Sequence, residues 1–182
     1  MGDKMERRRF LMQAVSASAL SLGLPGLTLP NVLASTVGPG EGGVIIPPGV
    51  APSVFSEIIQ GKRPCHKIYE DEYTFSFLSR DEIRLGHTLV VPRIQIDKFW
   101  EVPEPYYRAV FAAAKKISKA ILIATGCERV GTLISGYEIP HFHYHLVPMH
   151  EERDLRDGEL YRPNPKELRQ IQTRIVAALR EL

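Results

Sequence analysis

The sequence predicts an α+β fold in which an antiparallel sheet of five strands packs against a long helix and a C-terminal helix. Five short runs have the alternating or β-branched and aromatic character of strands, and short turns join them. Two longer segments carry apolar residues at helical spacing. Strands that follow one another through short turns pair antiparallel, with the helices covering the sheet. The expected strands are residues 66–70, 73–79, 87–93, 128–135 and 140–148, and the expected helices are 104–125 and 163–182.

The long helix has clear boundaries. Pro103 and Pro105 lie near its start and Gly126 lies just past its end, as helix boundaries prefer. Its apolar residues recur at helical spacing and give it one apolar face, which we expect to pack against the sheet. These residues are Val110, Ala113, Ala114, Ile117, Ala120 and Ile121.

The composition is that of one globular domain. The chain has 182 residues, of which 44% are hydrophobic and 24% are charged, values ordinary for a domain with a proper core. Its formal net charge of +2 is too small to favour nucleic acid or an acidic membrane as a partner. Cys65 and Cys127 are too few for a disulfide framework, and we expect two free thiols.

The first 34 residues differ from the rest of the chain. Three arginines at 7–9 precede the pair Phe-Leu at 10–11, a weakly apolar run follows, and it ends in the small-residue pattern VLA at 32–34. This pattern is typical of a twin-arginine export signal. Glycine and proline interrupt the apolar run, so a stable membrane span is not expected. We therefore predict a periplasmic or exported protein; the alternative is a cytoplasmic protein with a disordered extension.

Residues 35–52 are rich in glycine and proline and are expected to form a linker. The folded domain is then expected to occupy residues 53–182.

The segment PHFHYHLVP at residues 140–148 contains half of the chain's six histidines. Apolar residues alternate with the histidines, which predicts a strand. Because successive side chains of a strand point to opposite faces, the histidines are expected on one open face and the residues between them in the core. The open face would hold His141, His143 and His145, and the core Phe142, Tyr144 and Leu146.

Three interpretations of this face remain open. A plain polar surface would require three histidines to coincide. A metal site fits the spacing, since neutral imidazole binds zinc, copper and iron, but side chains along one strand diverge, so one ligand would have to come from elsewhere. In the third interpretation one imidazole, with an unperturbed pKa of about 6.5, attacks phosphorus while its neighbours stabilise charge on the phosphoryl oxygens.

Several motifs together resemble the histidine triad (HIT) superfamily of nucleotide hydrolases and transferases. HFHYHLV fits the signature His-φ-His-φ-His-φ-φ, where φ is apolar, at every position. LGHTLVVPR is similar to the PGHTLVIPK strand of that superfamily, and SVFSEIIQGKRPCHKIYEDE is similar to the start of its domain. The resemblance covers residues 53–182.

The resemblance implies a role for four histidines. His143, the middle residue of the triad, would attack the α-phosphorus and form a covalent nucleotidyl-histidine. His141 would orient His143 through its backbone carbonyl, His145 would bind phosphate oxygens, and His87 would complete the phosphate side of the site. This chemistry needs no metal or other cofactor. The resemblance also implies a homodimer that pairs across the long helix and an adjacent strand.

The chain departs from the superfamily in its recognition residues. Ser53 and Ser56 stand where a zinc-binding cysteine pair is usual, so a structural zinc is not expected there. Ser79 stands where an acidic residue commonly holds the ribose. Where many members have Gly-Gln-Ser or Gly-Gln-Thr, in contact with ribose, phosphate or leaving group, this chain has residues of a different kind. They are Gly136, Tyr137 and Glu138.

The leading hypothesis is a hydrolase of nucleotide phosphoanhydrides or phosphoramidates, or a nucleotidyl transferase, that works through His143. Because the recognition residues differ, a nucleotide-binding or sensing protein with vestigial catalysis is the first alternative. A histidine-ligated metalloenzyme is the second.

Overall fold

The computed structural model describes residues 43–80, 83–155 and 161–182 and confirms the α+β fold. The strands are β1 (Lys67–Glu70), β2 (Thr74–Leu78), β3 (Thr88–Pro92), β4 (Arg129–Ile134) and β5 (Tyr144–Met149). The α-helices are α1 (Val54–Ile59), α2 (Tyr106–Thr125) and α3 (Pro165–Arg180), with 3-10 turns at η2 (Phe99–Glu101) and η3 (Glu152–Leu155). The predicted export signal lies outside the described residues.

The sheet has five antiparallel strands in the order β1-β2-β3-β5-β4. The central pairing of β3 with β5 places Leu89 opposite His145 and Val90 opposite Tyr144. Paired residues of a sheet project from the same face, so His145 shares a face with Leu89.

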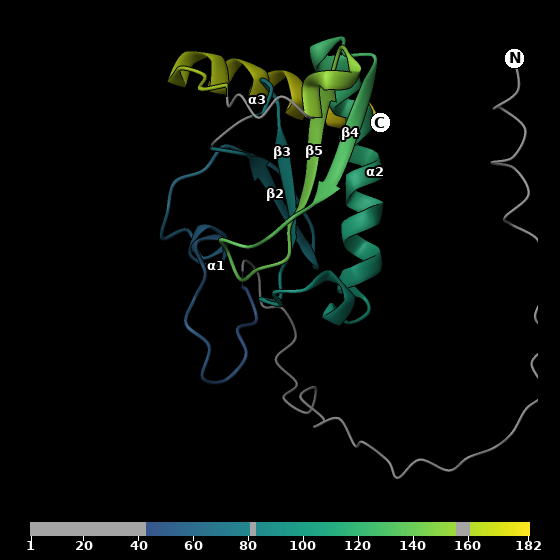
Figure 1. Cartoon of the computed structure of the whole chain (residues 1–182). Helices are drawn as coiled ribbons and strands as arrows, with labels where there is room; N and C mark the ends of the chain where they lie inside the picture. The colour runs from purple at the N-terminus through teal and green to yellow at the C-terminus, as the bar shows by residue number, and fades with distance from the viewer. Residues whose placement is uncertain (1–42, 81–82, 156–160) are drawn as a thin grey trace, which may run out of the picture. The chain divides into compact units, whose positions relative to one another are not determined.

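The two faces of the sheet carry cores of different size. α2 and α3 cover one face, where α2 runs along the sheet and α3 crosses one end (Figure 1). All six apolar positions predicted for the long helix are buried. The other face carries a smaller cluster in which Phe55 and Ile59 of α1 pack on the sheet. The sheet residues of that cluster are Phe75, Phe77, Leu89 and Val91.

Capping residues set one end of each long helix. α2 ends at Thr125 and is capped by Gly126, whose left-handed backbone (φ 71°) is readily adopted by glycine. α3 begins with a capping box, in which the Asn164 side chain accepts from backbone N–H groups and Glu167 bonds back to the Asn164 N–H.

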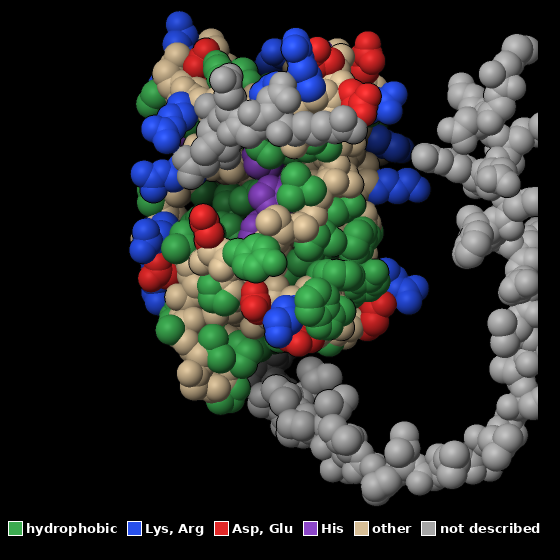
Figure 2. All heavy atoms as spheres, viewed as in Figure 1, with side chains coloured by type: hydrophobic (Ala, Val, Ile, Leu, Met, Phe, Trp, Pro, Cys, Tyr) green, Lys and Arg blue, Asp and Glu red, His purple; other side chains and the backbone are tan. Residues whose placement is uncertain are grey.

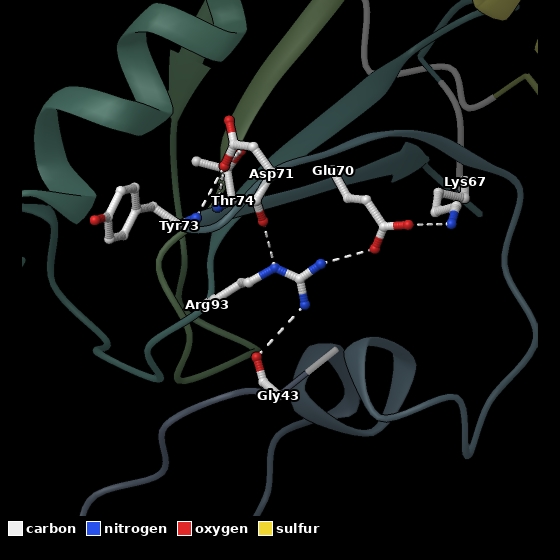
Figure 3. Close-up of polar contacts among 7 residues, drawn as sticks. All are labelled: Gly43, Lys67, Glu70, Asp71, Tyr73, Thr74 and Arg93. Atoms are coloured by element: carbon white, nitrogen blue, oxygen red, sulfur yellow. Dashed lines mark hydrogen bonds and ion pairs between the residues drawn. The ribbon is translucent and has the colours of Figure 1, made fainter. Parts of the chain in front are cut away.

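The packed domain begins before the expected boundary at Ser53. Ile45 forms a parallel bridge with Ile94, where the Ile45 N–H donates to the Arg93 carbonyl at 2.9 Å. The buried Arg93 guanidinium then joins two other parts of the chain: Nε donates to the Asp71 carbonyl and Nη2 to the adjacent Glu70 carboxylate, while Nη1 donates to the Gly43 carbonyl (Figure 3). Gly43 and Ile45, which lie in the predicted linker, therefore contact the folded domain.

The sequence predicted a strand along the whole histidine segment, and this prediction is wrong for the first part of the segment. β5 begins at Tyr144, so His141 to His143 precede it, and Pro148 lies inside it. Pro148 lies beyond Leu146, the last β5 residue paired with β3, so no ladder is interrupted on that side.

Cys65 and Cys127 are free, and burial raises the pKa of the Cys65 thiol. Within the described ranges no helix is long and apolar enough to cross a bilayer.

Candidate active site

A cavity of about 990 Å³ opens beside α1 and holds three of the four predicted histidines. His87, His143 and His145 line it, whereas His141 does not. Histidine side chains are visible in this hollow, bordered by hydrophobic side chains (Figure 2). The expectation that all three triad side chains share one open face is therefore wrong for His141, whose ring is fully buried and bonds to Ser53 and to the Pro92 carbonyl.

The hydrogen bond of His143 fixes which of its nitrogens is free. Nδ1 lies 2.8 Å from the His141 carbonyl oxygen, and a carbonyl only accepts, so Nδ1 carries the proton. In the neutral ring Nε2 then keeps its lone pair. The ring is 7% exposed and lies edge-on to Phe55, with centroids 5.1 Å apart. Burial lowers its pKa, and the bond to the His141 carbonyl opposes that shift.

His87 and His145 form a chain of hydrogen bonds with a definite direction. The Ile83 N–H donates to His87 Nδ1 at 3.2 Å, so the neutral His87 ring carries its proton on Nε2. That nitrogen lies 2.9 Å from His145 Nδ1 and donates to it. His145 must then carry its own proton on Nε2, which is buried and has no hydrogen-bond partner among the described residues.

The electrostatics keep this pair neutral. Burial, followed by the neighbouring imidazoles, lowers the pKa of His87 to about 3, and burial and His143 lower that of His145 to about 4. At neutral pH His145 therefore presents an N–H and no positive charge. The His143 and His145 ring centroids are 4.9 Å apart, so a nitrogen with a free lone pair and an N–H donor belong to adjacent rings.

The His141 side chain lies outside the cavity and bonds to the surrounding chain. Its Nε2 lies 2.9 Å from the Pro92 carbonyl and its Nδ1 lies 2.9 Å from the Ser53 hydroxyl. The side chain is fully buried, and burial lowers its pKa to about 4. The three triad imidazoles therefore do not converge on one point, and the described residues include no cluster of three or more His, Cys, Asp or Glu side chains suited to a metal ion.

The predicted recognition residues all line the cavity. Ser79 is buried, whereas Tyr137 and Glu138 are exposed. The backbone at Gly136 passes close to the site, because a Cβ added there would lie 3.7 Å from His143 Cε1. The rest of the wall is largely apolar and includes Val54, Phe55, Ile58, Phe77, Leu89 and Ile139.

Sequence reasoning missed three residues of this site. Phe55 packs on His143, and Ser53 and Gln95 belong to the buried polar group around His141. In the sequence Ser53 stands out only as the replacement of a zinc-binding cysteine, and Gln95 lies in RIQID, which has no recognisable pattern. Ser53 directly before an apolar pair is an N-cap signal that could have located α1.

The positions expected to bind zinc in this superfamily do not fit a zinc ion here. Zinc takes thiolate, imidazole and carboxylate ligands, whereas Ser53, Ser56 and Gln95 offer two hydroxyls and an amide beside the single imidazole of His141. The polar atoms of these side chains bond to one another and to nearby backbone.

The fold and this histidine arrangement define the chain as a histidine triad protein. The HIT domain family model matches residues 60–152, and the chain belongs to that family. It is 30% identical over 132 residues to adenylylsulfatase HINT3 of Arabidopsis thaliana, covering 70% of this chain and 67% of that protein. It is 28% identical over 104 residues to adenosine 5'-monophosphoramidase HNT1 of Saccharomyces cerevisiae, covering 57% and 66%.

A solved structure supports the same assignment. The zinc-bound histidine triad family protein of Mycobacterium smegmatis superposes with a TM-score of 0.60 at 25% identity, covering 70% of this chain and 93% of that one. The family therefore includes proteins named as hydrolases of nucleotide conjugates and at least one that binds zinc.

Proposed function

We propose that this protein hydrolyses a nucleotide phosphoanhydride or phosphoramidate, or transfers its nucleotidyl group, through a covalent intermediate on His143. One observation carries the proposal. His143 Nδ1 donates its proton to the His141 carbonyl, so Nε2 keeps a free lone pair. The His143 ring also lines the cavity. A neutral imidazole in this tautomer is a competent nucleophile near neutral pH.

The reaction takes two displacements. His143 Nε2 attacks the α-phosphorus, the bond from phosphorus to the leaving oxygen or nitrogen breaks, and the leaving group departs with the bonding pair and takes up a proton. Water then attacks the same phosphorus, the P–N bond to His143 breaks, and the water proton is released. A second nucleophile in place of water would give nucleotidyl transfer.

His145 stabilises the charge that develops in each step. Its Nε2–H is a buried donor with no partner in the described part of the chain, and His87 fixes it in that tautomer. A donor set in place before reaction stabilises charge on a non-bridging phosphoryl oxygen without reorganisation. His143, His145, His87 and His141 are thus the proposed catalytic and positioning histidines.

The names of the relatives support the substrate class. Sulfate on an adenylyl group and ammonia on adenosine monophosphate are leaving groups on the α-phosphorus, and proteins named for both reactions resemble this chain. Ser79, Gly136, Tyr137 and Glu138 lie where they can contact the nucleoside or the leaving group.

The test is incubation of purified protein with a panel of adenosine and guanosine conjugates, with and without chelator. The proposal expects release of nucleoside monophosphate in both conditions and none with His143→Ala. Tight binding without turnover would favour the vestigial nucleotide-binding alternative. Activity lost in chelator and restored by zinc would favour the histidine-ligated metalloenzyme.

We also propose a homodimer through α2 and the edge strand β4. Aromatic side chains form a chain of ring contacts from Tyr107 to Phe111 and on to Tyr144, with centroids 5.0 Å apart at each step. Tyr107 on α2 and Ile134 on β4 are exposed. Sedimentation of the wild type beside Ile134→Lys checks this: a wild type that sediments as a monomer would contradict it.

Export by the twin-arginine route remains a proposal based on residues 1–34. Cells expressing the full chain should be fractionated beside a variant with Arg7 and Arg8 changed to Lys. A shortened protein in the periplasm or medium is expected only for the wild type. Full-length cytosolic protein in both cases would leave the cytoplasmic alternative.

A further inference from the structure

Four side chains form a buried polar cluster behind the cavity. Ser53, Ser56, Gln95 and His141 are 6%, 0%, 3% and 0% exposed. They come from the start of α1, from the segment after β3 and from the segment before β5. The cluster thus joins parts of the chain that are far apart in sequence, and the function proposed above uses only the carbonyl of His141.

The protons at His141 can be assigned from its two partners. Nε2 faces the Pro92 carbonyl at 2.9 Å, and since a carbonyl only accepts, Nε2 is the donor. In the neutral ring Nδ1 is then an acceptor and needs a donor. The Ser53 hydroxyl lies 2.9 Å away and the Ser56 hydroxyl 3.4 Å away.

The proton of Ser56 is used elsewhere, which leaves Ser53 as the donor. Ser56 Oγ donates to Gln95 Oε1 at 2.6 Å, and the Ser53 N–H donates to the same oxygen at 2.8 Å. Gln95 Nε2 donates to the Ala51 carbonyl at 2.9 Å, which fixes the orientation of the amide. Each hydroxyl has one proton, so Ser53 gives its proton to His141 Nδ1.

The backbone at His141 lies outside the sheet ladder, where the His141 N–H donates to the Ile139 carbonyl at 2.7 Å and the side chain adds its two bonds to Ser53 and Pro92. β5 begins at Tyr144, which pairs with Val90 and Ile134. His141 to His143 lie outside the ladder, where the Phe142 N–H donates to the Ile96 carbonyl at 2.6 Å. The carbonyl that accepts from His143 therefore belongs to a residue whose ring is fixed at both nitrogens.

We infer that Ser53 is a positioning residue for His143: its hydroxyl holds the His141 ring, and through it the His141 carbonyl that sets the tautomer of His143. The inference rests on the proposed function. At the positions where cysteines would bind zinc in the superfamily, this chain fixes the His141 ring by hydrogen bonds. Ser56 and Gln95 keep Ser53 in place: the Ser56 N–H donates to Ser53 Oγ, and the Ser53 N–H donates to Gln95 Oε1.

The kinetic test compares Ser53→Ala with Ser53→Thr, which keeps the hydroxyl and the helix N-cap. Displacing a reacting group by a fraction of an ångström to an ångström costs about 10- to 100-fold in rate. We expect Ser53→Ala to lower kcat by about that factor with KM little changed, and Ser53→Thr to restore most of it. The matched control is Thr74→Val, which also removes a buried hydroxyl bond but lies away from the cavity.

A spectroscopic test does not depend on turnover. Nitrogen-15 NMR of the imidazole rings should show His141 protonated on Nε2 and His143 on Nδ1 in the wild type. Ser53→Ala should leave His141 protonated on Nε2, because the Pro92 carbonyl still accepts there, but should mix the tautomers of His143 as the His141 carbonyl shifts. Thr74→Val should leave both rings unchanged.

The outcomes separate the two proposals. A wild type that turns over no conjugate defeats the proposed function, while the NMR result still decides the role of Ser53. The inference is overturned if His141 carries its proton on Nδ1 in the wild type. It is also overturned if Ser53→Ala leaves the tautomer of His143 and the kcat of an active enzyme at the level of Thr74→Val.

Discussion

His141 and His145 are equivalent in the sequence pattern, but the structure uses them in opposite ways. Both ring nitrogens of His141 bond to the chain itself, at Ser53 and Pro92. His145 bonds through Nδ1 alone, and its Nε2 has no partner in the described residues. A buried imidazole bonded at both nitrogens supports the structure around it, whereas one with an open nitrogen can act on a ligand.

His143 lies between these extremes and draws on both. Its Nδ1 bonds to the backbone of the fixed His141, and its ring lines the cavity beside His145. In the proposed mechanism, the difference between the two ends of the triad separates a positioning half from a reacting half.

The largest effect is expected at the centre of this comparison. His143→Ala removes the nucleophile and should lower turnover by several powers of ten, on the scale seen for other covalent nucleophiles. The fold should survive because the ring borders a cavity, which circular dichroism and thermal unfolding can check. Wild-type activity in this variant would end the covalent account.

The next effect is expected at the reacting end. His145→Ala removes the open N–H and should lower kcat by about 100- to 1,000-fold, the usual cost of losing one such donor. His87 acts only through His145, so His87→Ala should cost less, and the double variant should be no worse than His145→Ala alone. Additive losses would show that His87 has a separate role.

Acid should destabilise the protein because its buried histidines are neutral. The pKa is about 3 for His87 and about 4 for His141 and His145, against about 6.5 in an unfolded chain. Below pH 6.5 the unfolded chain binds protons that the native state does not, so the free energy of unfolding falls as the pH drops toward 4.

Thermal unfolding at a series of pH values checks this dependence. His87→Gln should flatten part of it, because one of the buried neutral rings is then absent. A melting temperature that stays constant from pH 7 to pH 4.5 would contradict the assignment of neutral rings.

The smallest effect is expected in the recognition residues. Ser79 offers a hydroxyl where a carboxylate would accept two ribose hydroxyl protons, so discrimination between nucleoside and non-nucleoside conjugates should be weak. Ser79→Asp should improve it by about tenfold, the worth of one stronger hydrogen bond. A wild-type preference of a hundredfold or more for adenosine conjugates would show that other residues hold the nucleoside.

Most of the fold could be predicted because it rests on periodic patterns. The five strands and two long helices carry alternating or helical spacing over enough residues to be read. α1 has six residues, too few for a periodicity, and residues 43–52 are rich in glycine and proline although Ile45 joins the fold.

The site was predictable only in part, for a related reason. The histidines stand out in the sequence, but alternation implied a strand from the first of them, and the strand begins at Tyr144. The partner of His141 lies 88 residues away at Ser53, and no local pattern shows such a contact. Which nitrogen of each ring is free depends on these distant partners.

The central claim is that His143 Nε2 is the reacting nitrogen, and rapid quenching tests it most directly. Protein mixed with an adenosine phosphoramidate should be quenched in alkali, digested and mapped by mass spectrometry. The account predicts an adenylyl group on His143, attached at Nε2, and none in His143→Ala. An adduct on His145 or His87, or turnover without any adduct on the enzyme, would contradict it.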